Sequence, residues 1–461
     1  MGGSPILTRE FAAECALGAL LRGAAEFARR AMPDASSALA CERLAERAEW
    51  LNSNSAADAL KAAAGSYNPR TPIEHLLDIA WRAASGPPRN GGRRTSRTIS
   101  PMGAIFRWKP AGAAAPELPM APLQTGPSIF PVTGGASDDG AVRKLFEDFS
   151  AALSALRSAD SPALIQSLIA ALETFAWCVP ADDYGSVSIF ELSRSAAAIA
   201  AALAAAAPPD ATPERLRTSE LMLVVGDLGG IQRFLYTTVP SKAARMLRGR
   251  SLGLQLIADA IAARILADLG LPATNLLYSG GGKLWLLISA ASREALAEKS
   301  EQIDLELNRA FASRLSFGIG CAPASLDQLT NNAPSIWERA TRDLARNRRR
   351  RFSYAMEPNY AAIFEPFGDP ARVCQICGAP DRNLERLSPD NDDRERLACV
   401  HCRDFVKLGG YATRAKLIIR ATTAAAPPIA PLCSYRAPGG GEIIYWRLQM
   451  LTGNAMKLTS L

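Results

Sequence analysis

Histidine is nearly missing from this chain. Among 461 residues only His75 and His401 occur, and only the first lies within residues 1–370. A metal centre that needs several imidazoles within one helical bundle therefore cannot be assembled there. Long apolar runs are missing too, because no uninterrupted stretch reaches the roughly 18 residues of a membrane-spanning helix. The alanine-rich residues 196–207 predict a packed helix instead.

A cationic start is also absent from the N-terminus, which carries Glu10 and so does not resemble a signal peptide. We therefore expect a cytoplasmic protein with no membrane partner. The length predicts about two to four domains. Hydrophobic residues make up 48% and charged residues 21%, an ordinary globular balance. The net charge of +7 favours anionic partners, nucleic acid first.

The basic excess is concentrated in one segment, which is followed by Phe352 and Tyr354. Thirteen residues there hold seven arginines: Arg339, Arg342, Arg346, Arg348, Arg349, Arg350 and Arg351. Clustered guanidinium groups bind phosphates in bidentate fashion and release counterions, which favours a phosphate-contacting patch. A solvated helix end is the alternative.

Four of the nine cysteines form two CxxC pairs, Cys374/Cys377 and Cys399/Cys402, with 21 residues between them. This spacing predicts a tetrahedral zinc site with four thiolate ligands. The alternatives are disulfides, which are rare in a reducing compartment, or a redox pair, which would not need the second CxxC. Four thiolates leave no open position, so the predicted zinc is structural, and His401 is a bystander. The other cysteines are scattered singly: Cys15, Cys41, Cys178, Cys321 and Cys433.

Residues 219–290 have the order strand, long helix, hairpin. The apolar run 221–225 predicts a buried strand, and apolar residues repeat at three and four from about Leu252 to Leu269 before Gly270. Residues 275–278 and 284–288 predict two strands around a glycine turn. This order is typical of a ferredoxin-like palm, the fold of polymerases and nucleotide cyclases.

A catalytic palm holds two metal ions with an aspartate on its first strand and two carboxylates in its hairpin turn. Asp227 suits the first role, but Gly282 and Lys283 stand where the carboxylates should be. A protonated lysine does not ligate metal, so we expect no two-metal chemistry and no catalytic residue. Phosphate or ribose could still approach the turn backbone, although the glycines could equally serve the turn alone. The candidate nucleotide-binding residues are Asp227, Ser279, Gly280, Gly281, Gly282 and Lys283.

The strings GDLGGIQRFLY, MLRGRSLGLQLIADAIA and NLLYSGGGKLWLL resemble the first palm domain of the Csm-type large subunit of type III CRISPR effector complexes. RRRRFSY, IFEPFG and CQICG resemble that family's passage from palm to zinc module. The likeness runs from about residue 100 to 415. It implies an α+β multidomain protein with a helical HD-like domain, a ferredoxin-like palm and a small four-cysteine zinc module.

The resemblance also implies what the N-terminal region has lost. Relatives open with a helical HD domain whose adjacent His and Asp ligate metal for single-stranded DNA cleavage, and here Arg22 and Gly23 stand at that pair. His75 is expected to be a packed or surface residue rather than a ligand. The expected domains are 1–100 (degenerate HD-like), 101–215 (irregular connection and helical segment), 216–355 (palm), 356–425 (zinc module) and 426–461 (tail).

Relatives continue into a second palm with a Gly-Gly-Asp-Asp motif, which makes cyclic oligoadenylate from ATP. No carboxylate pair follows the zinc module here, since Asp404 is the last aspartate and Glu442 the last acidic residue. A naturally short chain, a partner that supplies the second palm, and a fragment all remain open.

The predicted function is a structural, RNA-binding component of a type III effector complex without nuclease or cyclase activity of its own. Its expected partners are guide RNA, paralogue subunits and target RNA. One alternative is half of a split cyclic-oligoadenylate synthetase, which binds ATP only together with a partner palm chain. Another is a general zinc-ribbon nucleic-acid binder unrelated to CRISPR. The candidate RNA contacts are Arg248, Arg250, Arg346, Arg348, Arg349, Arg350 and Arg351.

Overall fold

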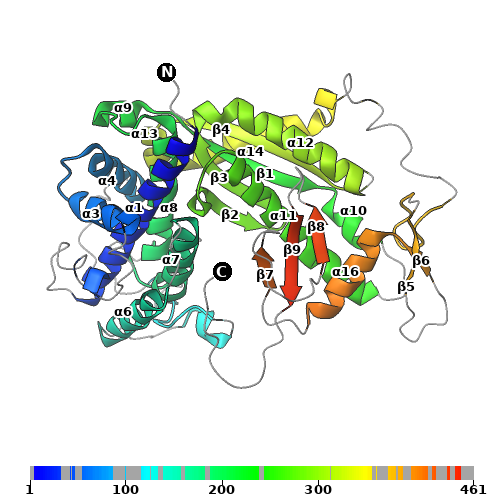
Figure 1. The fold of residues 1–461 in the computed structure, drawn as a ribbon, viewed down its shortest axis with the longest axis horizontal. Helices are drawn as coiled ribbons and strands as arrows, with labels where there is room; N and C mark the ends of the chain where they lie inside the picture. Colours follow the sequence, from blue (N-terminus) through cyan, green and yellow to red (C-terminus); the bar gives the residue numbers. More distant parts are fainter. Residues whose placement is uncertain are drawn as a thin grey trace, which may run out of the picture.

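The structure is a computed structural model. It describes residues 5–32, 42, 44–46, 54–86, 99, 116–124, 126–132, 139–156, 161–181, 187–237, 243–311, 313–355, 360, 372–380, 383–387, 396–413, 418–421, 433–436 and 442–447. The IFEPFG string at 363–368 and most of the Pro/Gly/Arg-rich segment 86–98 lie outside these residues. The described chain is a mixed helical and sheet protein, as expected (Figure 1).

A helical domain forms one end of the molecule, drawn from blue to green in Figure 1. Its helices are α1 (Pro5–Ala31), α3 (Asn54–Gly65), α4 (Pro72–Ser85), α6 (Asp139–Ser154), α7 (Ser161–Ala176), α8 (Ile189–Ala206) and α9 (Pro213–Thr218). One buried apolar cluster runs through them, so helices α1, α3 and α4 share a single core with the helices after residue 138. A Cβ on Gly23 of α1 would lie 1.8 Å from the Ser193 Oγ of α8, so these two helices cross closely.

Helix α8 is the one described helix long and apolar enough to cross a membrane by length and composition. However, 72% of it is buried inside the protein. Its alanines pack in the centre of the helical domain, as predicted for residues 196–207.

A four-stranded antiparallel sheet forms the middle of the molecule, with strand order β2-β3-β1-β4. The chain runs β1-α11-β2-β3-α12-β4, which is the split βαβ order of ferredoxin-like folds. The elements are β1 (Leu221–Gly229), α10 (Ile231–Tyr236), α11 (Ala243–Asp268), β2 (Leu276–Gly280), β3 (Lys283–Ser289), α12 (Arg293–Phe311), β4 (Ser316–Ala324), α13 (Leu326–Asn331) and α14 (Ala333–Arg349). Short 3-10 turns lie at η2 (Pro127–Ile129), η3 (Ala273–Asn275), η4 (Ala290–Ser292) and η5 (Ser353–Ala355).

The two faces of the sheet carry different helices, because side chains alternate along each strand. Met222 and Val224 of β1 pack with α11 and α12 in one core. Leu223 and Val225 face the other way and pack with α14 in a smaller cluster.

Helix α14 also covers the outer edge of β4, which pairs with no further strand among the residues that the structure describes. Three of its side chains bond outward backbone groups of that strand: Asn347 Nδ2 to Ile319 O (2.8 Å), Cys321 N to Asp343 Oδ2 (2.9 Å) and Arg339 Nη2 to Pro323 O (2.8 Å). From α12, Asp304 Oδ1 accepts Phe317 N at 2.8 Å. One backbone group of each of residues 317, 319, 321 and 323 therefore has a side-chain partner.

Polar contacts join the helical domain to the sheet. The Asn275 side chain donates to Ala198 O of α8 (3.0 Å) and to Leu287 O of β3 (2.7 Å), and it is fully buried. Arg194 of α8 donates to the carbonyls of Leu276 and Leu277 on β2. The two domains are therefore joined through backbone carbonyls as well as through apolar packing.

A small module follows the sheet, built from β5 (Glu385–Leu387), β6 (Arg396–Ala398) and α16 (Val400–Tyr411). A second antiparallel sheet, of order β7-β9-β8, contains β7 (Ile418–Ala421), β8 (Cys433–Arg436) and β9 (Glu442–Arg447). The predicted tail at 426–461 thus holds two strands that share a sheet with β7, which lies before the predicted boundary.

Candidate metal and nucleotide sites

The four clustered cysteines converge on one point. Their sulfur atoms lie within 4.8 Å of one another, and all four residues are buried. A tetrahedral zinc with Zn–S bonds of about 2.3 Å requires sulfurs about 3.8 Å apart. Cys377 Sγ and Cys399 Sγ are 3.8 Å apart. The donor set therefore fits a structural Zn²⁺, held by Cys374, Cys377, Cys399 and Cys402.

Local backbone geometry aims the sulfurs. Gly378 has φ +68°, and its N–H donates to Cys374 O at 2.7 Å, which closes the first CxxC turn. Cys399 caps the N-terminus of α16, and its N–H lies 3.3 Å from Cys374 Sγ. Hydrogen bonds from the Cys374, Cys399 and Cys402 thiols hold the pKa of Cys377 far below its usual range. His401 packs against Phe311 and lies outside the cluster.

Asp227 lies on β1, on the sheet face that α14 covers. Its side chain is 5% exposed and forms an ion pair with Arg348, whose side chain is half exposed. The residue opposite it on β3 is Lys283, so the lysine side chain projects from the same face. Two cations thus stand beside the carboxylate that a palm would use as a metal ligand.

A cavity of about 350 Å³ adjoins Asp227 and Arg348. On its far wall Asp304 is 3% exposed and accepts a hydrogen bond from Tyr354 Oη at 2.8 Å. Burial raises the pKa of Asp304, although Phe317 N–H and Tyr354 O–H oppose the shift. The Tyr354 bond ties the chain after the arginine run back to α12.

The glycine turn opens on the opposite side of the sheet from Asp227. Gly281 and Gly282 have φ +60° and +80°, as a two-residue hairpin turn requires. Both glycines line a mostly apolar cavity of about 760 Å³ between α10, α11 and α16, with Arg248 at its wall. Ser279 Oγ donates to Asp259 Oδ1 of α11 at 2.8 Å. The six candidate nucleotide residues therefore do not converge on one pocket.

The predicted RNA-contacting arginines differ in their surroundings. Arg250 is 2% exposed and donates to Phe234 O and Thr237 O, both at 2.6 Å. The expectation that Arg250 contacts RNA is corrected, because its side chain is buried inside the protein. Arg348 pairs with Asp227, and Arg351 donates to Ser313 O (3.4 Å).

The other candidates are accessible. Arg346, Arg349 and Arg350 are exposed and form no ion pair with any residue that the structure describes. Arg248 is also exposed, and its Nε donates to Gly409 O at 3.4 Å.

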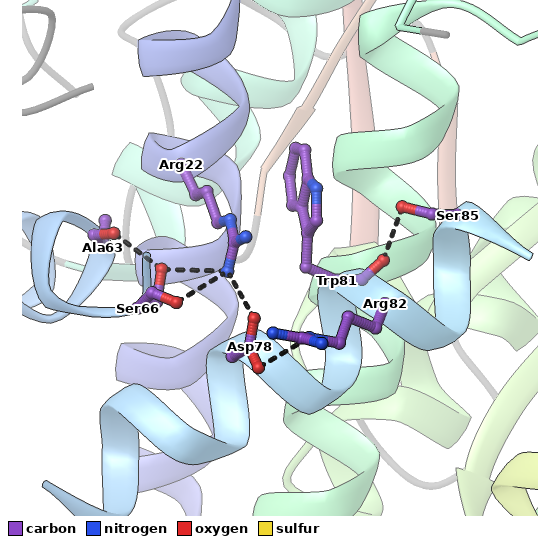
Figure 2. A network of polar contacts seen from close by, with 7 residues as sticks. All are labelled: Arg22, Ala63, Ser66, Asp78, Trp81, Arg82 and Ser85. Carbon is purple, nitrogen blue, oxygen red and sulfur yellow. Dashed lines mark hydrogen bonds and ion pairs between the residues drawn. The ribbon is translucent and has the colours of Figure 1, made fainter. Parts of the chain in front are cut away.

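A buried cation, Arg22, lies in the helical domain. The Arg22 guanidinium donates to Ser66 Oγ (3.0 Å) and Ser66 O (3.3 Å) and pairs with Asp78 (3.7 Å) (Figure 2). The rings of Tyr67 and Trp81 lie 4.6 and 4.9 Å from its central carbon. Burial lowers the pKa of Arg22, which Tyr67 and Asp78 counteract.

The chain is similar to known proteins over part of its length. A family model described as Csm1 subunit domain B matches residues 220–368. The chain is 25% identical over 290 residues to the single-strand-specific deoxyribonuclease Cas10/Csm1 (subtype III-A) of Methanocaldococcus jannaschii, covering 53% of this chain and 36% of the relative. It is 38% identical over 112 residues to the same subunit of Mycobacterium tuberculosis, covering 23% of this chain and 14% of the relative. The chain is therefore similar to the Cas10/Csm1 large subunits, and its match to domain B covers residues 220–368.

Solved Csm1 structures have the same fold. The Csm1–Csm4 subcomplex of the type III-A interference complex superposes with TM-score 0.67 at 21% identity, over 95% of this chain and 56% of that Csm1. A Csm1–Csm4 cassette in complex with cA3 gives 0.66 at 20% identity, over 97% and 56%. This chain therefore spans little more than half of those Csm1 chains. The likeness to Cas10/Csm1 argues against the alternative of a zinc-ribbon protein unrelated to CRISPR.

Several contacts of this Cas10/Csm1 relative were not predicted from its sequence. Asp78, Asp259 and Asp304 were not singled out, and each meets its partner across a helix or sheet interface. Their partners Arg22, Ser279 and Tyr354 were named from the sequence, but nothing in the sequence indicated these contacts.

Proposed function

We propose that this chain is a structural, RNA-binding component of a type III CRISPR RNA-guided antiviral effector complex, with neither HD nuclease nor cyclase activity of its own. One observation carries the proposal. At both positions where the family resemblance implies catalytic metal, an arginine guanidinium pairs with a carboxylate: Arg22 with Asp78, and Arg348 with Asp227.

In the helical domain, taken here as a degenerate HD-like domain, the Arg22 guanidinium fills the space beside Asp78. The positive charge of Arg22 repels a divalent cation, and its ion pair occupies the Asp78 carboxylate that could have bound one. His75 is half-buried on α4 and belongs to no potential metal-ligand group among the described residues. The domain then serves as a scaffold that holds the sheet through Asn275 and Arg194.

In the ferredoxin-like domain, taken here as the first palm, a two-metal site would need several carboxylates around Asp227. Lys283 and Arg348 supply positive charge there instead. The zinc module adds rigidity, since four thiolates leave the metal no open position for substrate.

RNA binding is proposed for the outer surface of α14, whose residues form three rows. Ile336, Ala340 and Leu344 are buried against the sheet, and Arg339, Asp343 and Asn347 bond the β4 edge. Arg342, Arg346 and Arg349 form the outward row at helical spacing, and Arg350 follows. With no ion-pair partner among the described residues, this row suits the phosphates of guide or target RNA.

Co-expression with the genomic neighbours tests the main proposal. We expect the chain to copurify with guide RNA and paralogue subunits from the cytoplasm, without a membrane fraction. We also expect the isolated chain to cleave no single-stranded DNA and to turn over no ATP when Mn²⁺ or Mg²⁺ is added. Absence of any guide-containing complex, or metal-dependent turnover by the isolated chain, contradicts the proposal.

The arginine row has a separate test. The triple variant Arg346→Ala/Arg349→Ala/Arg350→Ala loses three phosphate contacts. The negative slope of log affinity against log salt should therefore become less steep by about 2 for single-stranded RNA. The double variant Arg215→Ala/Arg217→Ala, which removes exposed arginines of α9, is the control and should keep the slope. Equal slopes in the triple variant and the wild-type chain contradict RNA binding at α14.

A second candidate function is half of a split cyclic-oligoadenylate synthetase. The cavity of about 760 Å³ favours it, because Gly281, Gly282 and Arg248 combine there with apolar walls that suit a nucleobase. Solved Csm1–Csm4 relatives include complexes with AMPPNP and with ATP. ATP would then bind only when a partner palm chain completes the pocket. Cyclic product from a mixture of the two chains, and from neither alone, is the result that favours this function.

A further inference from the structure

Arg250 joins three elements beneath the cysteine cluster. It belongs to α11, is 2% exposed, and donates through Nη1 to Phe234 O and Thr237 O at the C-terminal end of α10. Its Nη2 lies 3.8 Å from Cys402 Sγ in the first turn of α16. Arg250 thus contacts one of the four sulfurs directly.

Glycines bring the two long helices close enough for this contact. A Cβ on Gly249 would lie 1.8 Å from Phe405 O, and a Cβ on Gly409 would lie 1.8 Å from Arg245 O. Helices α11 and α16 therefore approach backbone to backbone beside Arg250. A second arginine, Arg314, donates to Cys377 O and contacts the module from α12's side of the core, but through a carbonyl rather than a sulfur.

The charge of the site gives this contact a role. Zn²⁺ with four thiolates carries a net charge of −2, and the cluster is buried. A buried charge needs a partner, and an N–H donor to sulfur orients a thiolate and tunes the metal. We propose that Arg250 is a positioning residue of the zinc site, whose guanidinium donates to the Cys402 thiolate and offsets the charge of the centre.

The same guanidinium links the metal to the glycine-turn cavity. Ile231 and Leu235 of α10 line that cavity, and Arg250 bonds the carbonyls at the end of this helix. Loss of zinc would remove the sulfur partner of Arg250 and loosen its hold on α10. Metal occupancy and the shape of the cavity wall are therefore coupled through one side chain.

The test compares Arg250→Gln with Arg248→Gln in the full chain. Arg248 is two residues away on the same helix, is exposed, and contacts Gly409 O rather than a sulfur. In competition with a zinc chelator, the zinc affinity of Arg250→Gln should be about 10- to 100-fold weaker than that of the wild-type chain. The zinc affinity of Arg248→Gln should be unchanged. In the Co²⁺-loaded chain, the sulfur-to-cobalt charge-transfer band should shift to lower energy in Arg250→Gln alone, because the thiolate loses a hydrogen bond.

The band position separates this role from a purely structural one, which would lower the amount of bound metal and leave the band in place. Equal zinc affinity and an unmoved band in Arg250→Gln would overturn the proposal. If that variant does not fold, Arg250→Lys decides, since an ammonium keeps the charge but cannot reach the sulfur and both α10 carbonyls together. A shifted band in Arg250→Lys supports the proposal and an unshifted one overturns it.

The inference rests on the zinc site itself, which is tested separately. Wild-type chain purified under reducing conditions should hold one zinc per chain. A wild-type chain without zinc contradicts the zinc site, whereas a zinc-loaded wild-type chain whose Arg250 variants bind zinc normally contradicts only the role of Arg250.

Discussion

The two arginine–carboxylate pairs differ in how firmly the protein holds them. Arg22 is 6% exposed, bonded to Ser66 and flanked by two aromatic rings, so its guanidinium has one possible position. Arg348 lies near the end of α14 with half of its side chain exposed, and only the Asp227 end of the pair is buried. The first pair is part of a core, whereas the second lies at a surface from which the arginine could turn away.

The largest effect is expected when the buried pair is broken. Arg22→Ala should cost about 3–5 kcal/mol of unfolding free energy, because Asp78 and Ser66 lose a partner in the core. For a domain of this size the melting temperature should fall by roughly 6–20 °C. Hydrogen exchange should rise in α1 and α4.

Arg82→Ala is the matched control, since Arg82 pairs with the same Asp78 (2.8 Å) but its side chain is 78% exposed. It should cost less than about 1 kcal/mol. Equal losses of unfolding free energy in Arg22→Ala and Arg82→Ala would show that the buried contact of Asp78 is worth no more than its exposed one.

A smaller effect is expected at the second pair. Arg348→Ala should cost about 1–2 kcal/mol of unfolding free energy. The cost is smaller because solvent reaches the arginine and partly compensates for the lost charge. Raising the salt concentration from 0.1 to 1 M should shrink this difference, as the screening length falls from about 10 to about 3 Å. The Arg22→Ala difference should not change with salt. The same salt dependence in both variants would remove the contrast between the two pairs.

The smallest effect concerns metal binding. In Lys283→Asp/Arg348→Ala, two carboxylates face each other on neighbouring strands without a competing cation, and weak Mn²⁺ binding should appear by electron paramagnetic resonance. Lys283→Asp alone should bind none, because Arg348 still pairs with Asp227. If Mn²⁺ binds equally well with and without Arg348, the arginine does not prevent metal binding at Asp227.

Local patterns predicted much of this molecule. The β1–α11–β2–β3 order followed from apolar periodicity and a glycine turn, and the cysteine cluster followed from spacing alone. Helix α11 begins at Ala243 rather than near Leu252, because its first turns carry arginines whose partners lie on α10 and α16. Without those partners the segment resembles a polar loop.

Long-range pairing could not be predicted. Asp227 and Arg348 are far apart in the chain and meet only because α14 returns across the sheet. Arg250 resembled an RNA contact for the same reason, since its partners are carbonyls and a sulfur that the sequence does not mark. The arginine run likewise gave no indication that α14 divides its polar residues between the β4 edge and the solvent.

The division of the α14 polar residues between the β4 edge and the solvent also affects self-association of the chain. An open edge strand is a template on which a second chain can add a strand and start an aggregate. At β4, the side chains of Asp304, Arg339, Asp343 and Asn347 already bond four of the outward backbone groups. The chain is thereby protected from self-association along this edge, and the same helix leaves exposed the arginine row proposed to bind RNA.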